Sequence, residues 1–195
     1  MYYSIYKNLR NDSWQCLLDA NITSLPVDVL AIARFAKVRV LKNSPLNELS
    51  PGEAAKTYTR GTDWFIIYDD LRPAEESRFA IAHELGHIFL GHAMTFAKYS
   101  NVSEFGKKPK TEQQADMFAL RLLSPACVLK GLELHSAQEI AEHCKIPLEK
   151  AELRSKRIKT LYSKNMFFTD PIELELFNRF KDYMISVKCV SDNDL

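Results

Sequence analysis

Residues 78–91, with the sequence RFAIAHELGHIFLG, contain the motif HExxH, which is formed by His83, Glu84 and His87. We expect this run to be helical, so that His83 and His87 lie one turn apart on the same face. Two imidazole side chains at this spacing can bind one zinc ion. Glu84 lies about 100° around the helix from His83, beside the two ligands, where a general base for the attacking water is needed. The stretch therefore predicts two metal ligands and a catalytic base on one helix.

The motif is short, and the alternative is a helix that carries two histidines and no metal. The apolar residues of the run lie on most sides of the helix, which predicts that the helix is central and buried. Buried polar groups without partners cost about 1–3 kcal/mol each, and a bound metal would satisfy the histidines. We therefore favour a metal site. The apolar residues on which this rests are Phe79, Ala80, Ala82, Leu85, Ile88, Phe89 and Leu90.

A downstream run, TEQQADMFALRLLSP at residues 111–125, predicts a second helix with Thr111 as its N-cap and Pro125 at its end. Glu112 falls in the first turn, and Asp116 lies one turn later on the same face. Catalytic zinc takes three protein ligands and keeps one position open, so Glu112 is the predicted third ligand. Asp116 is predicted to accept the free ring N–H of a ligating histidine. The alternative for both carboxylates is a solvated acidic helix start, favoured by the helix dipole.

Three stretches together resemble the ImmA/IrrE-type zinc metallopeptidases, an HExxH, gluzincin-like family. They are Leu25-Pro26-Val27-Asp28 with Ile32-Ala33, residues 78–87, and residues 112–125, which match the family's E-x-x-A-(N/D)-x-F-A-x-x-L-L-x-P. The resemblance spans roughly residues 22–160. Two departures, Ser124 where the family often has Met and His92 five residues after His87, do not touch the chemistry.

The resemblance implies a compact cytoplasmic protease that cuts a helix-turn-helix repressor and thereby controls mobile-element or stress genes. It also implies one zinc ion per chain, bound by His83, His87 and Glu112, with Glu84 as the base and Asp116 as the partner of a ligand. A donor set of two nitrogens and one oxygen also admits manganese, cobalt or nickel.

Composition agrees with a small enzyme. The 195 residues suggest one domain by default, and 46% of them are hydrophobic, enough to build a core. A net charge of +1 argues against a general attraction to nucleic acid or membranes, and no apolar run approaches the roughly 20 residues that span a bilayer. The first residues do not look like a secretory signal. The four cysteines form no CxxC, so we expect reduced thiols and a cytoplasmic location.

The order of patterns predicts an α+β fold: a mostly helical zincin-like metalloprotease core with a small three-stranded twisted sheet, plus C-terminal helices. Helices are expected over residues 1–21, 26–36, 73–91, 111–124, 136–144, 148–162 and 167–190, and strands over 38–41, 57–60 and 64–68. We expect a metallopeptidase domain over residues 1–130 and a C-terminal helical region over residues 131–195. Residues 64–68 are the candidate edge strand for a peptide substrate, with an ordinary core strand as the alternative.

The helical pair at residues 136–162 resembles a helix-turn-helix, and residues 145–164 contain seven Lys or Arg against two Glu. DNA contact is therefore one interpretation, but packing or partner docking is favoured and direct nucleic-acid binding is not expected. The segment of residues 93–110 joins the two ligand helices and could cover the cleft. Tyr99, His92 and His135 are candidates to stabilise the oxyanion, although no spacing supports any of them.

These observations favour a zinc-dependent endopeptidase, and the family resemblance implies that its substrate is a cognate helix-turn-helix repressor. The alternative is a regulatory protein that binds or sequesters the repressor without cutting it. A third interpretation, a DNA-binding regulator, rests on the basic helix alone.

Overall fold

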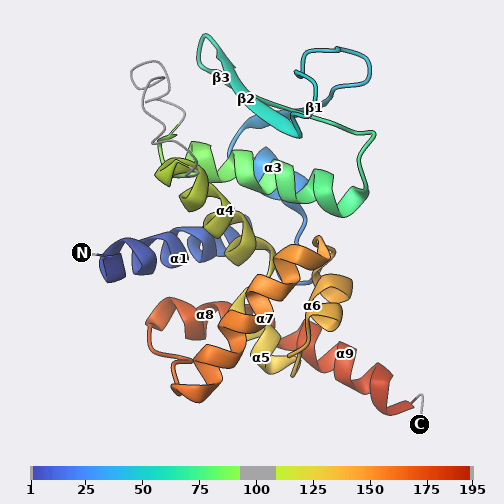
Figure 1. Cartoon of the computed structure of the whole chain (residues 1–195). Coiled ribbons are helices and arrows are strands. Elements are labelled where there is room, and N and C mark those ends of the chain that lie inside the picture. The colour runs from blue at the N-terminus through green and yellow to red at the C-terminus, as the bar shows by residue number, and fades with distance from the viewer. Residues whose placement is uncertain (1, 93–108, 194–195) are drawn as a thin grey trace.

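The computed structural model describes residues 2–92 and 109–193, and its elements confirm the α+β class. A small sheet lies near the start of the chain, and helices make up most of the rest (Figure 1). The elements in chain order are α1 (Tyr2–Asp19), α2 (Val29–Phe35), β1 (Val38–Lys42), β2 (Ala55–Arg60), β3 (Asp63–Tyr68), α3 (Ala74–Phe89), α4 (Lys110–Leu123), α5 (Ala126–Gly131), α6 (Ala137–Cys144), α7 (Leu148–Ser163), α8 (Pro171–Arg179) and α9 (Lys181–Asn193).

The sheet has the strand order β1-β3-β2, so β3 is its central strand. β3 runs parallel to β1, with Val38 opposite Trp64, and antiparallel to β2. The prediction that residues 64–68 form an edge strand is therefore wrong. The physical reason is that β1 pairs with the side of β3 that β2 leaves open, so β3 has a neighbour on each side. The adjacent side chains Ile66 and Ile67 are both buried, as in a strand covered on both faces.

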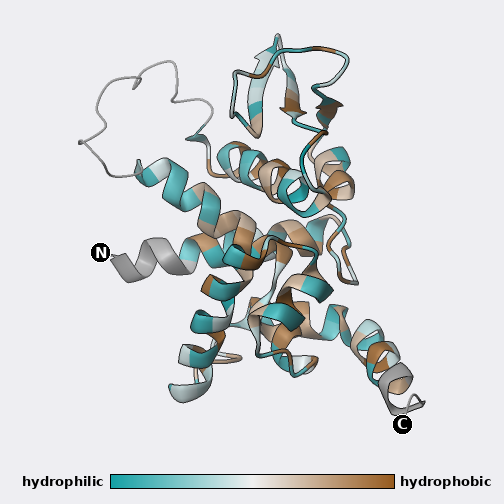
Figure 2. Ribbon diagram, turned by 45° about the vertical axis from the view of Figure 1, so that its right-hand side comes forward, coloured by the Kyte–Doolittle hydropathy of each residue, from teal (hydrophilic) through white to brown (hydrophobic). Residues whose placement is uncertain are grey.

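Helix α3 lies between the sheet and most of the other helices (Figure 1), whereas α2 contacts β1 directly. The sheet covers one side of α3, and α4 packs along another side, with α1 against α4. Hydrophobic residues gather where these helices face one another (Figure 2). Trp14 from α1, Leu85 from α3 and Phe118 from α4 are all fully buried there. The predicted central helix is thus central, and it holds the HExxH motif between the sheet and α4.

Helix α4 begins two residues earlier than an N-cap at Thr111 implies. Its N-cap is Pro109, with φ −52° and ψ 151°, and Lys110 is the first helical residue. The prediction that Thr111 caps this helix is therefore wrong, because the fixed φ of Pro109 already suits a helix start and Thr111 lies inside the first turn. Glu112 still falls in the first turn, and α4 ends before Pro125, as expected.

The C-terminal region differs from prediction at two places. Residues 126–131 form the short helix α5, which was not predicted. The single helix expected over residues 167–190 is wrong, because the chain forms α8 and α9 with Phe180 between them. Phe180 is fully buried at this break, so the core fixes a bend that has no glycine or proline beside it, since Pro171 lies at the start of α8.

Two arginines tie the C-terminal helices to the ligand helices. The Arg154 guanidinium on α7 donates from Nε to the Ser124 carbonyl oxygen at 2.8 Å, just beyond the end of α4. Arg78 on α3 donates to the backbone oxygens of Val27 at 2.8 Å and Lys145 at 3.3 Å.

The expected division between residues 130 and 131 falls at the end of α5 and stays a prediction. Across the described ranges, no helix is long and apolar enough to cross a membrane.

Gly86 allows α3 and α4 to approach closely. A Cβ atom at this position would lie 3.1 Å from Phe118 Cδ1 and 3.3 Å from the Ala115 carbonyl oxygen. Both neighbours are fully buried, so they cannot move aside easily. We expect Gly86→Val to lower the free energy of unfolding by about 1–3 kcal/mol, the usual cost of overpacking. Urea denaturation measures this, and unchanged stability would show that the helices can separate without penalty.

Candidate metal centre

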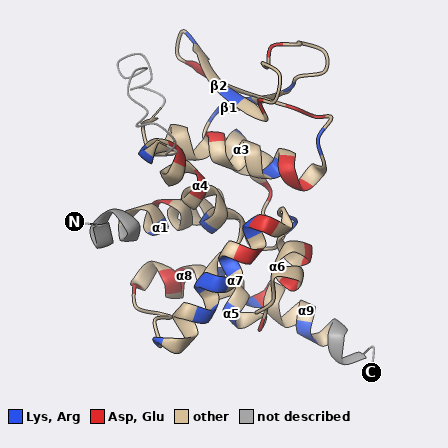
Figure 3. Cartoon of the chain, in the orientation of Figure 1, with Lys and Arg blue, Asp and Glu red and all other residues tan. Residues whose placement is uncertain are grey.

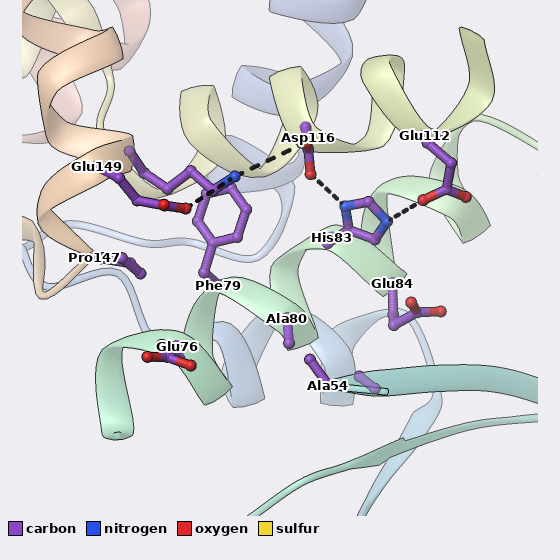
Figure 4. Close-up of a pocket in the computed structure, with 12 residues that line it drawn as sticks. Ala54, Glu76, Phe79, Ala80, His83, Glu84, Glu112, Asp116, Pro147 and Glu149 are labelled. Carbon is purple, nitrogen blue, oxygen red and sulfur yellow. Dashed lines mark hydrogen bonds and ion pairs between the residues drawn. The ribbon is translucent and has the colours of Figure 1, made fainter. Parts of the chain in front are cut away.

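Three donor atoms from α3 and α4 converge on one point. His83 Nε2 and His87 Nε2 are 3.0 Å apart on consecutive turns of α3. The Glu112 carboxylate on α4 places Oε2 at 3.2 Å from His83 Nε2 and Oε1 at 3.2 Å from His87 Nε2. Figure 4 shows His83 between Glu112 on one side and Asp116 on the other. The sequence-predicted ligands are thus brought together, although they come from two helices.

The spacing of these donors fits one metal ion. Ligand atoms at 2.0–2.1 Å from a tetrahedral zinc ion are about 3.3 Å from one another. The donor atoms of His83, His87 and Glu112 form a group within 4.8 Å, and their closest separations of 3.0–3.2 Å approach that value. His87 is buried, while the His83 and Glu112 side chains remain 14% and 30% exposed toward the pocket. The set can therefore hold an ion that stays open to a substrate.

Electrostatics at the donors also favour a cation. Hydrogen bonds with His83 and His87 hold the pKa of the Glu112 carboxyl well below its usual range. Burial lowers the pKa of His83, but hydrogen bonds with Asp116 and Glu112 outweigh it and raise that pKa to about 9. Both shifts reflect the attraction between the histidines and the carboxylates, and a divalent ion bound here would take the place of the proton on His83 Nε2.

Asp116 lies behind His83, on the side away from the other donors. Its Oδ1 is 2.8 Å from His83 Nδ1. A carboxylate in this position accepts the Nδ1–H, so that the Nε2 lone pair points toward Glu112 and His87. This is where the sequence predicts Asp116 to lie.

Glu84 lies beside the donors and lines the pocket with His83 and Glu112. Thr57 on β2 donates from Oγ1 to Glu84 Oε2 at 2.6 Å. Burial, the largest influence, raises the pKa of the Glu84 carboxyl, and the Thr57 hydrogen bond lowers it. The position and the raised pKa both suit a group that takes up a proton. Sequence reasoning missed Thr57, because nothing in its spacing links it to Glu84, 27 residues away.

A pocket of about 560 Å³ opens along α3 from the donors to the start of α7 (Figure 4). The sequence does not predict that residues 54–55 and 147–150 join this wall, because both segments lie far from the two predicted metal-binding helices along the chain. The residues that line it are Ala54, Ala55, Glu76, Phe79, Ala80, His83, Glu84, Glu112, Asp116, Pro147, Glu149 and Lys150.

The three oxyanion candidates have different positions. The His92 ring packs edge-on against His87, with centroids 5.3 Å apart, so it lies near the donors. His135 packs against Tyr162 at 5.0 Å and is not among the residues that line the pocket. Tyr99 and most of the joining segment, residues 93–108, lie outside the described residues.

Comparisons with known proteins agree with this geometry. The peptidase family described as "IrrE N-terminal-like domain" matches residues 36–156, more than half of the chain. Metallopeptidase ImmA of Bacillus subtilis (strain 168) is 29% identical over 124 residues, which cover 62% of this chain and 70% of the relative. The family match includes the sheet, both ligand helices and the first half of α7. The chain therefore belongs to the metallopeptidase family of IrrE N-terminal-like domains.

Proposed function

We propose that the protein is a zinc-dependent endopeptidase that cuts a helix-turn-helix repressor in the cytoplasm. The observation that carries this proposal is the triangle of His83, His87 and Glu112 donors, 3.0–3.2 Å apart, with Glu84 beside it. Two histidines and one glutamate form a usual donor set of catalytic zinc in proteases. The family and the similarity to Metallopeptidase ImmA support the peptidase activity. The repressor as substrate rests on the family resemblance.

His83, His87 and Glu112 would hold the zinc ion, which when bound would polarise the scissile carbonyl and lower the pKa of the attacking water. Glu84 takes a proton from that water and later passes it to the leaving amine. Thr57 orients the Glu84 carboxylate through their 2.6 Å hydrogen bond. Asp116 holds His83 in the tautomer that a ligand needs.

Strand β2 is our candidate for the substrate-binding edge. It pairs with β3 on one side, and no other strand in the described ranges pairs with its outer side. Ala55 at its start lines the pocket, and Thr57 contacts Glu84. An extended peptide that pairs with this edge by strand addition would pass close to the base. This assignment takes the place of the one made for residues 64–68.

Direct DNA binding is not part of the proposal. Arg154 is only 4% exposed and bonds Ser124, and Lys150 lines the pocket, so two of the seven cations of residues 145–164 are committed within the protein. Acidic and basic residues are mixed on α7 (Figure 3). Packing or repressor docking therefore remains our interpretation of this helix.

The test is metal analysis of the purified protein followed by incubation with a candidate repressor. We expect about one zinc ion per chain in the wild type. His83→Ala and Glu112→Ala should lose the metal, and cleavage of the repressor should stop with chelator and return with zinc. A protein that binds no zinc on titration would overturn the proposal. Zinc binding with repressor capture but no cleavage would favour the alternative, a non-cleaving regulatory protein.

Removal of the Thr57 hydroxyl should slow the reaction without weakening substrate binding. Thr57→Val keeps the shape of the side chain but removes the hydrogen bond to Glu84. A hydrogen bond to a charged group is worth about 1.5–3 kcal/mol, so kcat should fall roughly 10- to 100-fold with little change in KM. Thr57→Ser is the control and should retain most of kcat. Equal kcat values for wild type and Thr57→Val would show that Thr57 does not position the base.

A further inference from the structure

Lys150, in the first turn of α7, extends the chain of contacts behind the metal centre. Its ammonium Nζ lies 3.9 Å from Asp116 Oδ2, and the other oxygen of the same carboxylate, Oδ1, lies 2.8 Å from His83 Nδ1. Asp116 thus has a ligating histidine on one side and an ammonium group on the other. Lys150 belongs to the C-terminal helices, outside the region where the sequence predicts the peptidase domain.

The Lys150 side chain is held from three elements. Its Nζ lies 4.8 Å from the centroid of the Phe79 ring on α3, a cation–π contact, and 3.5 Å from Glu149 Oε1 on α7 itself. Phe79 is 7% exposed and precedes His83 by one helical turn, so the ring that supports the ammonium is fixed on the ligand helix. The Lys150 and Asp116 side chains are only 22% and 27% exposed. This is a partly buried network rather than an isolated surface pair.

We propose that Lys150 is a positioning residue for the metal centre. It holds the Asp116 carboxylate in the orientation that accepts the Nδ1–H of His83, so that His83 Nε2 stays directed at His87 and Glu112. Outer partners of ligating histidines tune metal affinity through this kind of orientation. The proposal rests on the proposed function, because it assumes that His83 is a ligand.

Lys150 also lines the pocket, so direct contact with substrate is the alternative role that the experiment must distinguish. The two roles differ in what they change. Positioning through Asp116 alters metal affinity in the absence of substrate, whereas substrate contact alters KM and leaves metal affinity unchanged. Metal affinity of the full chain is therefore the deciding measurement.

The experiment is zinc titration against a chromogenic chelator at fixed pH and ionic strength. Asp116→Asn should weaken zinc binding about 10- to 100-fold, the usual range for such partners. Lys150→Met keeps the packing on Phe79 and should weaken binding about 3- to 10-fold, because it acts one step further out. Lys150→Arg should restore most of the affinity. In the Asp116→Asn background, Lys150→Met should have no further effect, as expected for a residue that acts only through Asp116.

A second readout follows the geometry of the site. Cobalt(II) bound by the wild type and by Lys150→Met should differ in visible absorption, because the orientation of the His83 ring changes. Lys156→Met, an exposed position on the same helix, is the matched control and should leave both readouts unchanged. Circular dichroism establishes that each variant is folded.

Three outcomes would overturn the proposal. Unchanged zinc affinity in Lys150→Met, with or without a raised KM, removes Lys150 from the metal centre. An equal loss in the wild-type and Asp116→Asn backgrounds means that Lys150 does not act through Asp116. A wild-type protein that binds no zinc overturns the proposed function itself, and this assignment with it, which separates the two failures.

Discussion

Replacement of Glu84 with Gln is expected to stop peptide hydrolysis while the metal stays bound. Glutamine has the same shape as glutamate and can still accept the Thr57 hydrogen bond, but its amide cannot take a proton from the attacking water. Loss of a general base lowers rates by about 10²- to 10⁴-fold. His83, His87 and Glu112 are untouched, so metal content should stay near the wild-type value. Repressor cleavage and metal analysis on the same sample measure both quantities.

Glu76→Gln is the matched control for this variant. Glu76 also lines the pocket, but it lies at the start of α3 and pairs with Arg72 at 3.4 Å. Its replacement removes the same charge from the pocket and should change the rate by less than about threefold, since it takes no part in the proposed proton transfer. If Glu84→Gln retains wild-type activity, Glu84 is not the base. If Glu84→Gln loses the metal, Glu84 serves the metal site rather than the proton transfer.

Replacement of Arg154 with Met should give the largest loss of stability among the variants considered. Arg154 is 4% exposed and donates from Nε and Nη2 to the Ser124 carbonyl oxygen beyond the end of α4. Methionine fills similar space but leaves that buried oxygen without these donors. Loss of a hydrogen bond from a charged group and burial of an unsatisfied acceptor each cost about 1–3 kcal/mol. We therefore expect the free energy of unfolding to fall by about 2–4 kcal/mol. Urea denaturation of metal-free protein measures this.

Lys156→Met on the same helix is again the control, because Lys156 is exposed and its loss should change stability by less than about 0.5 kcal/mol. A stability of Arg154→Met within that limit would show that the Ser124 contact contributes little. The same curves test the predicted division at residue 130. Two separate transitions, with only the second shifted by Arg154→Met, would support a C-terminal region that unfolds by itself.

The ligand helices could be predicted because their signals are local. HExxH and the apolar spacing around it fix the helix and the face on which His83 and His87 lie. The same periodicity predicts a second helix that carries Glu112 and Asp116 on one face, and the family resemblance joins the two runs. The strands were also found nearly in place, since runs such as residues 64–68 are rich in aromatic and β-branched residues.

The remaining features depend on contacts between distant segments. The central position of β3 follows from its parallel pairing with β1, and alternation along a strand does not specify its neighbours. Thr57 and Lys150 join the site from β2 and α7, with no motif that connects them to α3. The bend between α8 and α9 is set by burial of Phe180, so only the packed core determines it.

The outer edge of β2 bears on which bonds a protease of this design would cut. A peptide that pairs with a strand edge must be extended over several residues. Helical segments of a folded repressor do not meet this requirement, whatever their sequence. Linkers do, as do segments that open transiently. On this basis, the protease would select cleavage sites first by an extended backbone conformation and then by the side chains near the scissile bond. The frequency with which the substrate segment opens would then set the rate at which the repressor is cut. A mutation that stiffens the repressor's linker should therefore protect the repressor as well as a mutation at the scissile bond.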